Sequence, residues 1–258
     1  MKSFFRALER RGADYLLISG QAAVLYGGAL SSVDVDLWVR PTSRNIERTV
    51  EALRDVDARV HKLTPPLEPR YWRAGHAFHF RVDDVHVDLM PRPPRVGGFV
   101  ACARRAARLD TEWGRLPVVA IEDLVEIKKT RRPPDYEVIT RLALIRLRRA
   151  EAEGGASRRV LRWALENIFR LHDLLATLRR WSTGPSLARA SSRASLRLAA
   201  AAPLDRAVPE RVAAPISDAI DRELRTLFKA DLRYWRPIVH ELRRLRRSGA
   251  LLPDGSPV

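Results

Sequence analysis

The chain has 258 residues, of which 46% are hydrophobic and 30% are charged, and it carries one cysteine, Cys102. This composition supplies enough apolar surface for a folded core and excludes a disordered chain, while a single cysteine excludes a disulfide framework and a cysteine-rich zinc site. No apolar stretch approaches the ~18 residues of a membrane span, and the first residues lack the apolar run of a signal peptide. We therefore expect a cytoplasmic protein that does not associate with membranes.

The formal net charge is +16, and the excess of basic residues is uneven along the chain. Residues 1–100 hold 15 basic and 12 acidic side chains, whereas residues 101–258 hold 32 and 19. A polyanionic partner such as RNA is one explanation of this excess. The arginine-rich composition typical of GC-rich genomes is the other, and the charge count alone does not separate the two.

The first half of the chain alternates short apolar segments with turn residues. Apolar periodicity, caps and turn signals predict helices over 2–12, 21–26, 42–53 and 122–129, and strands over 15–19, 33–39, 56–63, 77–82, 85–90 and 118–121. Loops rich in proline and glycine fall at 65–69 and 91–98. The order of these elements indicates a small mixed β-sheet flanked by helices, which is an α+β fold.

The second half changes character and becomes rich in arginine and leucine. Four segments there read as helical: 135–152, 157–181, 187–201 and 215–247. Pro133-Pro134 separates the first of them from the preceding helix, and Pro237 is expected to kink or break the last one. We therefore predict a domain over residues 1–150 and a helical, basic domain over residues 151–258.

Three aspartates stand in apolar strand sequences. Asp34 and Asp36 are two residues apart on the predicted strand 33–39, so their side chains share one face and start roughly 6–7 Å apart. Asp88 has the same apolar flanks on a later strand. Carboxylate oxygens suit Mg²⁺ or Mn²⁺, which keep some waters and bind substrate phosphates. The alternative for each aspartate is an exposed strand face with solvated carboxylates.

A small-residue turn, Ser19-Gly20-Gln21, precedes these aspartates and joins a strand to a helix. Backbone N–H groups at such a helix start suit phosphate oxygens. Taken alone, a Ser-Gly turn between a strand and a helix is ordinary. The combination of this turn with the aspartates is much more specific.

A basic segment follows the last predicted strand. Lys128 and Lys129 come after apolar helix residues, so one ammonium group is expected to face a site and pair with triphosphate oxygens. Arg131 and Asp135 are expected to fix this segment through a charge pair. The alternative is a solvated basic helix end, which the helix dipole favours at a C-terminus.

Three histidines accompany the strands. His76 and His79 lie three residues apart, and His86 alternates with Asp88 on one strand face. Residue type alone would allow a metal-binding role for His76 and His79, and the position of His86 would allow it to contact the site. Packing and hydrogen bonding are the favoured roles for all three.

The turn Ser19-Gly20, the Asp34-Val35-Asp36 strand and Asp88 together resemble the signature of the DNA polymerase β-like nucleotidyltransferase superfamily. The chain is similar in particular to bacterial minimal nucleotidyltransferases, including relatives of the AbiEii-type toxins. The resemblance covers residues 5–147, and its matching segments are 19–27, 32–37, 75–81, 85–90 and 123–135. One departure is that the superfamily usually begins the turn with glycine, where this chain has Ser19.

The resemblance implies a nucleotidyltransferase fold with the active site at the edge of the sheet. Asp34 and Asp36 would hold the catalytic and nucleotide-bound ions, and Asp88 would bind the catalytic ion and accept a proton from the attacking hydroxyl. The remaining residues implied in nucleotide binding or catalysis are Ser19, Gly20, Gln21, Lys128, Lys129, Arg131 and Asp135.

These expectations combine into a metal-dependent nucleotidyltransferase that moves NMP from an NTP to an acceptor hydroxyl. The predicted acceptor is an RNA end, such as that of tRNA, or a protein side chain, presented by the basic helical half. A toxin–antitoxin or defence role would add an antitoxin as partner. The alternative is a catalytically degenerate module that binds nucleotide or RNA, or an antitoxin-like protein whose task is protein association.

Overall fold

The computed structural model describes residues 1–258, which divide into two compact units. The sheet unit comprises residues 1–25, 29–127 and 233–258, and the helical unit comprises residues 26–28 and 128–232. Each unit is discontinuous in the sequence, because residues 26–28 belong to the helical unit and the last part of the final helix belongs to the sheet unit. The predicted domain boundary near residue 150 stays a prediction.

The sheet unit is built on one seven-stranded sheet in the order β3-β4-β5-β2-β1-β7-β6. The strands are β1 Tyr15–Ile18, β2 Val35–Val39, β3 Arg59–Val60, β4 Phe78–Val82, β5 Val85–Met90, β6 Ala107–Thr111 and β7 Gly114–Val118. Strand β2 pairs with β5 in parallel and β1 pairs with β7 in parallel, whereas the other pairs are antiparallel. The prediction of an α+β fold with a mixed sheet is therefore confirmed.

Six helices accompany these strands along the chain. They are α1 Lys2–Arg11, α2 Ser19–Tyr26, α3 Ser43–Arg54, α4 Pro69–Ala74, α5 Phe99–Ala103 and α6 Ile121–Ile127. Helix α1 buries Phe4, Phe5 and Leu8 on one face and ends at Gly12 in the left-handed conformation, as its sequence predicts. Strands β1 and β2 bury nearly all their residues, so the centre of the sheet is rigidly held.

Several strand predictions were wrong in extent. Strand β3 has two residues rather than eight, because Asp57 and Lys62 on either side of it adopt positive φ values of 50° and 55°. The predicted strand 118–121 is the end of β7 followed by the start of α6, and the β6–β7 hairpin was missed. Strand β6 is an edge strand with no buried residue, so it lacks an apolar pattern. The short helices α4 and α5 were also not predicted.

The other edge of the sheet is covered by the chain's own last residues. Arg59 of β3 forms a bridge with Pro257, and the Val60 N–H donates to the Ser256 carbonyl at 2.8 Å. The Gly255 N–H donates in return to the Val60 carbonyl at 2.8 Å. This pairing satisfies backbone groups that an exposed edge strand would leave open.

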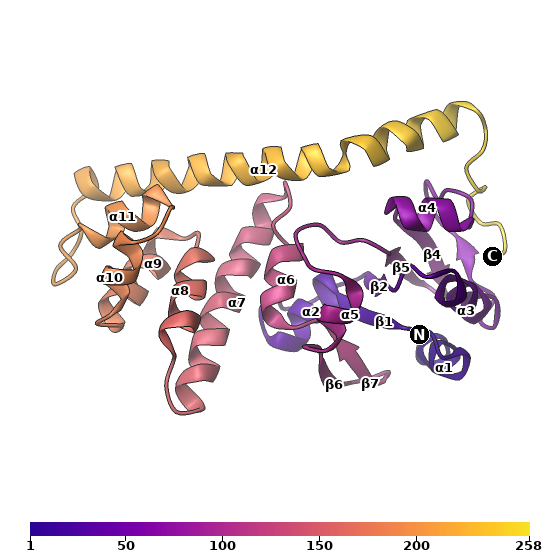
Figure 1. The fold of residues 1–258 in the computed structure, drawn as a ribbon, viewed down its shortest axis with the longest axis horizontal. Helices are drawn as coiled ribbons and strands as arrows, with labels where there is room; N and C mark the ends of the chain where they lie inside the picture. Colours follow the sequence, from indigo (N-terminus) through magenta and orange to yellow (C-terminus); the bar gives the residue numbers. More distant parts are fainter. The chain divides into compact units, whose positions relative to one another are not determined.

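The helical unit contains α7 to α11 and the first part of α12, which are labelled in Figure 1. Their bounds are α7 Pro133–Ala152, α8 Arg158–Glu166, α9 Leu171–Arg180, α10 Gly184–Arg189, α11 Ala194–Ala200 and α12 Glu210–Arg247. The helical character of the four predicted segments is confirmed, but 157–181 is divided into α8 and α9, and 187–201 into α10 and α11. The predicted interruption at Pro237 is not a break, because α12 continues to Arg247. None of the helices combines the length and apolar character that a bilayer span requires.

Candidate active site

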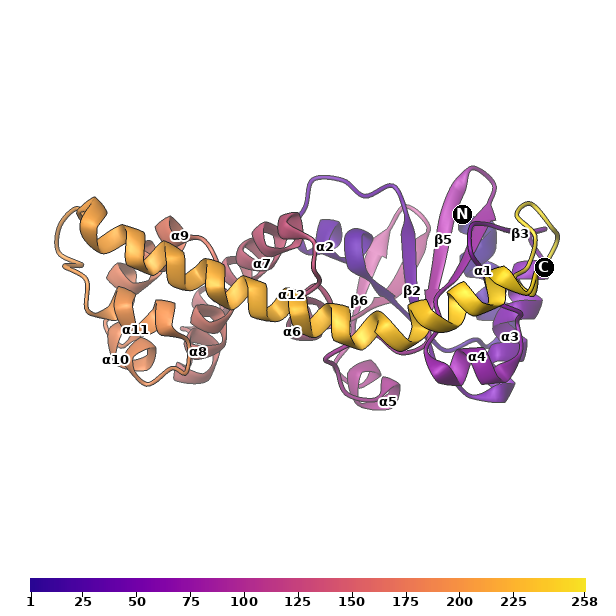
Figure 2. The ribbon, with the colours of Figure 1, turned by 90° about the horizontal axis from the view of Figure 1, so that it is seen from above.

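The register of the sheet places two of the three predicted carboxylates side by side. Asp36 on β2 is the Cα partner of Asp88 on β5, and it is also the partner of Ile18, the last residue of β1. Residues in register on neighbouring strands point to the same face, with their backbones ~4.8 Å apart. Figure 2 shows β2 and β5 next to each other in the sheet unit. Ile18, Asp36 and Asp88 therefore form one row across three neighbouring strands, and the turn that starts at Ser19 directly follows Ile18.

Asp34 is placed differently from its prediction. Strand β2 begins at Val35, so Asp34 lies in a bend just before the strand rather than on it. The expected inward apolar neighbour, Val33, is 83% exposed. Asp34 still lies near the β5 strand, because its Oδ1 is 3.3 Å from Nδ1 of His86. The strand placement of Asp34 was therefore wrong, although the residue remains close to β5.

Two of the three aspartates face a histidine. His79 on β4 is the register partner of Asp88, and its Nδ1 is 2.8 Å from Asp88 Oδ1. His86 faces Asp34 and stacks on His61, with ring centroids 4.3 Å apart. These contacts agree with the hydrogen-bonding and packing roles that the sequence favoured for His79 and His86.

The two adjacent carboxylates of Asp36 and Asp88 suit a hard cation, but they do not form a complete set of protein ligands. No group of three or more His, Cys, Asp or Glu side chains is arranged to hold a metal ion. A dedicated cage is not what Mg²⁺ requires, because it keeps several waters and takes one or two carboxylates together with substrate phosphates. Asp36 and Asp88, which are register partners, are two carboxylates of the kind that such a site would use.

The turn before α2 has an unusual backbone. Ser19 has a φ of 57°, in the left-handed region that costs a residue with a side chain of order 1–3 kcal/mol. At Gly20, an added Cβ would lie 2.2 Å from Ser32 Oγ and 2.9 Å from Ser32 Cβ, so no side chain fits there. Retained strain of this kind is typical of functional sites.

The same turn is tied to the segment that carries Asp34. The Gln21 side chain donates through Nε2 to the Ser32 carbonyl at 2.9 Å, and Ser32 Oγ donates to the Asp34 carbonyl at 3.2 Å. The position of Asp34 therefore depends on the turn formed by Ser19, Gly20 and Gln21. The sequence predicted the turn and the aspartate but not this link between them.

Lys128 and Asp135 belong to the helical unit, where they pair with each other. Lys128 Nζ donates to Asp135 Oδ1 at 3.0 Å, and the two side chains are 9% and 11% exposed. Thr130 Oγ1 donates to the second carboxylate oxygen of Asp135 at 2.6 Å. The solvated helix end considered for this segment is therefore wrong for Lys128.

Arg131 does not form the charge pair with Asp135 that the sequence indicated. Asp135 is held by Lys128 and Thr130, whereas the Arg131 backbone N–H donates to Asp231 Oδ2 at 3.2 Å. The Arg131 guanidinium lies 3.7 Å from the same oxygen. The reason is tertiary: the buried carboxylate of Asp231 comes from α12, a hundred residues away in the chain.

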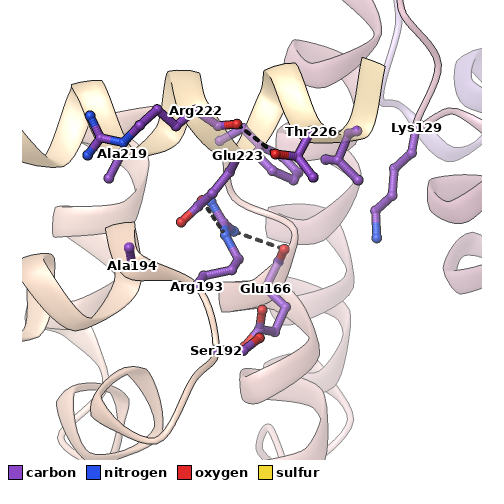
Figure 3. A pocket seen from close by; sticks show the side chains of 11 residues that line it. Lys129, Glu166, Ser192, Arg193, Ala194, Ala219, Arg222, Glu223 and Thr226 are labelled. Atoms are coloured by element: carbon purple, nitrogen blue, oxygen red, sulfur yellow. Dashed lines mark hydrogen bonds and ion pairs between the residues drawn. The ribbon is translucent and has the colours of Figure 1, made fainter. Parts of the chain in front are cut away.

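Lys129 lines a cavity of about 460 Å³ in the helical unit. Figure 3 shows its side chain reaching toward the space between α8, α12 and the residues before α11. The other lining residues are Glu166, Phe169, Ser192, Arg193, Ala194, Ala219, Arg222, Glu223, Thr226 and Leu227. Its size is in the range of small-molecule sites, and sequence reasoning did not find it because its residues come from distant segments.

A partly buried ion pair forms one wall of this cavity. Arg193 Nε donates to Glu223 Oε2 at 2.8 Å, and its Nη1 donates to the carbonyls of Leu165, Glu166 and Ile168 at the end of α8. Glu223 also accepts from the backbone and hydroxyl of Ser195. Burial raises the pKa of Glu223, but the charge of Arg193 and the Ser195 hydrogen bonds outweigh it and lower the pKa below 4.5.

Comparison with solved structures finds distant similarity, and one of the similar structures is described below. Neither the models of known protein families nor the curated protein sequences contain a match to this chain. A solved structure described as ANT(2″)-Ia in complex with adenylyl-2″-tobramycin is similar with a TM-score of 0.40 and 13% sequence identity. The alignment covers 64% of this chain and 92% of that one.

Proposed function

We propose that the chain is a metal-dependent nucleotidyltransferase that moves NMP from an NTP to an acceptor hydroxyl, with pyrophosphate as the leaving group. The observation that supports this most is the row Ile18, Asp36 and Asp88 across three neighbouring strands. It joins a strained turn suited to phosphate with two adjacent carboxylates suited to a cation. Neither feature alone indicates nucleotidyl transfer, but the reaction needs both in one place.

In this proposal the residues of the sheet unit divide the work. Asp36 and Asp88, together with Asp34, would hold Mg²⁺ or Mn²⁺, which when bound supplies charge stabilisation to phosphate oxygens. The turn formed by Ser19 and Gly20 would offer backbone N–H groups to the triphosphate. Asp88 would accept the proton of the attacking hydroxyl.

The helical unit would supply further contacts to the substrates. Lys128, Lys129, Arg131 and Asp135 are proposed to act on the nucleotide, with Asp135 fixing the Lys128 ammonium group. The acceptor is proposed to be an RNA end, and a protein side chain is the second choice, because residues 101–258 carry 32 basic against 19 acidic residues. A toxin–antitoxin or defence role belongs to the same proposal.

The direct test is label transfer. The purified protein is incubated with each α-labelled NTP, Mg²⁺ or Mn²⁺, and total cellular RNA and protein. We expect a labelled RNA or protein product that disappears in Asp36→Asn and Asp88→Asn, with a loss of at least about a hundredfold. The matched control is Asp110→Asn, an exposed aspartate on the edge strand β6, which should keep wild-type transfer. Full transfer by Asp36→Asn would contradict the proposal.

A second candidate is a module that binds nucleotide without turnover. Ser19 favours it, because a left-handed residue with a side chain replaces the glycine expected at the start of a phosphate-binding turn. Saturable NTP binding that depends on Mn²⁺, with no labelled product on any acceptor, would support this second candidate over the first.

A further inference from the structure

The sheet unit carries two histidine–aspartate pairs on neighbouring positions of one sheet face. Asp88 Oδ1 lies 2.8 Å from Nδ1 of His79, and Asp34 Oδ1 lies 3.3 Å from Nδ1 of His86. The first pair continues the row of Asp36 and Asp88, because His79 is the register partner of Asp88. The second pair involves His86, which lies two residues before Asp88 on β5.

Both pairs are partly shielded from solvent. The side chains of His79 and Asp88 are 23% and 25% exposed, and those of His86 and Asp34 are 35% and 48% exposed. His86 is also held from behind by His61, whose ring stacks on it at an interplanar angle of 11°. An ionised carboxylate only accepts hydrogen bonds, so the imidazole nitrogen facing it carries the proton.

Such a contact fixes the direction of a carboxylate. A strand aspartate has a broad terminal torsion, and its two oxygens would otherwise sample many orientations. With Oδ1 of Asp88 held by His79, Oδ2 is the oxygen directed to any other partner. Groups that orient metal-ligating side chains in this way typically change metal affinity by about 10–100-fold when removed.

We propose that His79 is a positioning residue for Asp88, and that His86 serves Asp34 in the same way, so that the carboxylates are oriented for a divalent cation. This inference rests on the proposed function, since it concerns the same cation site. His79 would not contact the cation itself; it would act through the Asp88 carboxylate. The backbone carbonyl of His79 also accepts from Thr64 Oγ1 and the His61 N–H, which keeps the strand position of the residue.

The test measures Mn²⁺ binding directly, by electron paramagnetic resonance or calorimetry, with Mn²⁺ alone as the probe. His79→Leu removes the donor, whereas His79→Asn places an amide donor near the position of Nδ1. We expect Mn²⁺ affinity to fall about 10–100-fold in His79→Leu and to be largely restored in His79→Asn. His240→Leu, at an exposed position on α12, is the control and should bind as the wild type does.

The outcomes separate the two proposals. If Asp88→Asn loses Mn²⁺ binding but both His79 variants bind like the wild type, the positioning role is overturned and the cation site stands. If neither Asp36→Asn nor Asp88→Asn changes Mn²⁺ binding, or the wild type shows no saturable binding, the cation site itself is overturned. Should His79→Leu fail to fold, judged by circular dichroism, His79→Gln displaces the donor by one methylene and should show the same loss.

In NMP transfer, the same variants should change the Mn²⁺ concentration needed for activity more than they change the maximal rate. The concentration of Mn²⁺ that gives half-maximal transfer should rise about 10–100-fold in His79→Leu, while the rate at saturating Mn²⁺ changes less. A purely structural role would lower the rate without moving the Mn²⁺ dependence, and that result would contradict the inference.

Discussion

Three residues decide the shape of the turn that opens the candidate site. Ser19 accepts a left-handed backbone, Gly20 leaves no room for a side chain beside Ser32, and the Gln21 amide reaches the Ser32 carbonyl. The residue that looks like a departure from a glycine turn therefore adopts the glycine-like conformation anyway. The turn keeps its geometry at an energetic cost that a glycine would not have.

This cost gives a prediction for stability. Ser19→Gly should raise the free energy of unfolding by about 0.5–1 kcal/mol. The free energy gained by removing the left-handed strain should exceed the extra backbone entropy that glycine loses on folding. Urea unfolding monitored by circular dichroism measures it. Gly20→Ala should lower stability by about 1–3 kcal/mol through the clash with Ser32. Gly98→Ala, which meets nothing within 4 Å, is the control. A destabilised Ser19→Gly variant would contradict the account of the turn.

The pairing of His79 with Asp88 was within reach of the sequence. Strands 77–82 and 85–90 were predicted with a two-residue connection at Asp83-Asp84, and counting outward from that turn places His79 opposite Asp88. Asp83 has a φ of 53°, as such tight hairpins require. By contrast, the neighbourhood of Asp36 and Asp88 joins distant segments in parallel, and no local count predicts its register.

At the scale of elements, α12 is tied to α8 and α11 of the helical unit by a single ion pair. Glu223 on α12 accepts from Ser195 at the start of α11, and Arg193 donates to the carbonyls that end α8. The Arg193 and Glu223 side chains are 10% and 18% exposed, so removing one of them would leave the charge of the other poorly compensated. The pair therefore bonds backbone carbonyls at the end of α8 and a backbone N–H group at the start of α11, and it links both helices to α12.

This link predicts a stability that depends on pH. The pKa of Glu223 is lowered in the folded state, so its contribution is fully present above its ordinary pKa of 4.5 and is lost as pH falls through the folded value. We expect Glu223→Gln to cost about 3 kcal/mol near neutral pH, and the difference from wild type to shrink as pH falls below the ordinary value of 4.5. Thermal unfolding as a function of pH measures the difference.

The matched control for that experiment is Glu153→Gln, an exposed glutamate just after α7. It should change stability by less than about 0.5 kcal/mol at every pH. A Glu223→Gln deficit that grows rather than shrinks as pH falls would contradict the assigned direction of the pKa shift.

At the scale of the whole molecule, the net charge of +16 is the property most relevant to partners. If RNA is the acceptor, part of its affinity must come from phosphate contacts with arginine, which release counterions. Three exposed arginines of this kind lie on α8: Arg158, Arg159 and Arg162. They are the most direct place to test whether the helical unit contacts RNA.

We predict that RNA affinity measured by fluorescence anisotropy falls at least about tenfold between about 50 and 200 mM salt. Replacing the three arginines of α8 with serine should weaken binding and flatten its salt dependence. The control replaces Arg6, Arg44 and Arg59, exposed arginines of the sheet unit, and carries the same loss of charge. Equal effects of the two triple variants would indicate that only net charge matters and would contradict a specific role for α8.

The sequence by itself determined the local features of this protein. Apolar periodicity and turn residues are local signals, so they predicted α1, β1, α2, β5 and the helical second half, and they drew attention to the aspartates and the Ser-Gly turn. The predictions failed where the apolar pattern of a segment did not match its backbone conformation or its burial. Strand β3 was overpredicted because left-handed residues interrupt an apolar run, and β6 was missed because an edge strand buries no residue.

Only the tertiary structure decided which of these features meet. Asp36 lies beside Asp88, and Asp34 lies just before β2 and faces His86. Asp135 accepts a hydrogen bond from Lys128, whereas Arg131 donates to Asp231. The physical reason is that strand register and helix packing are set by burial of the whole core rather than by the sequence near each residue. The types of residue needed for the proposed chemistry can be read along the chain, but their distances depend on how distant segments pack.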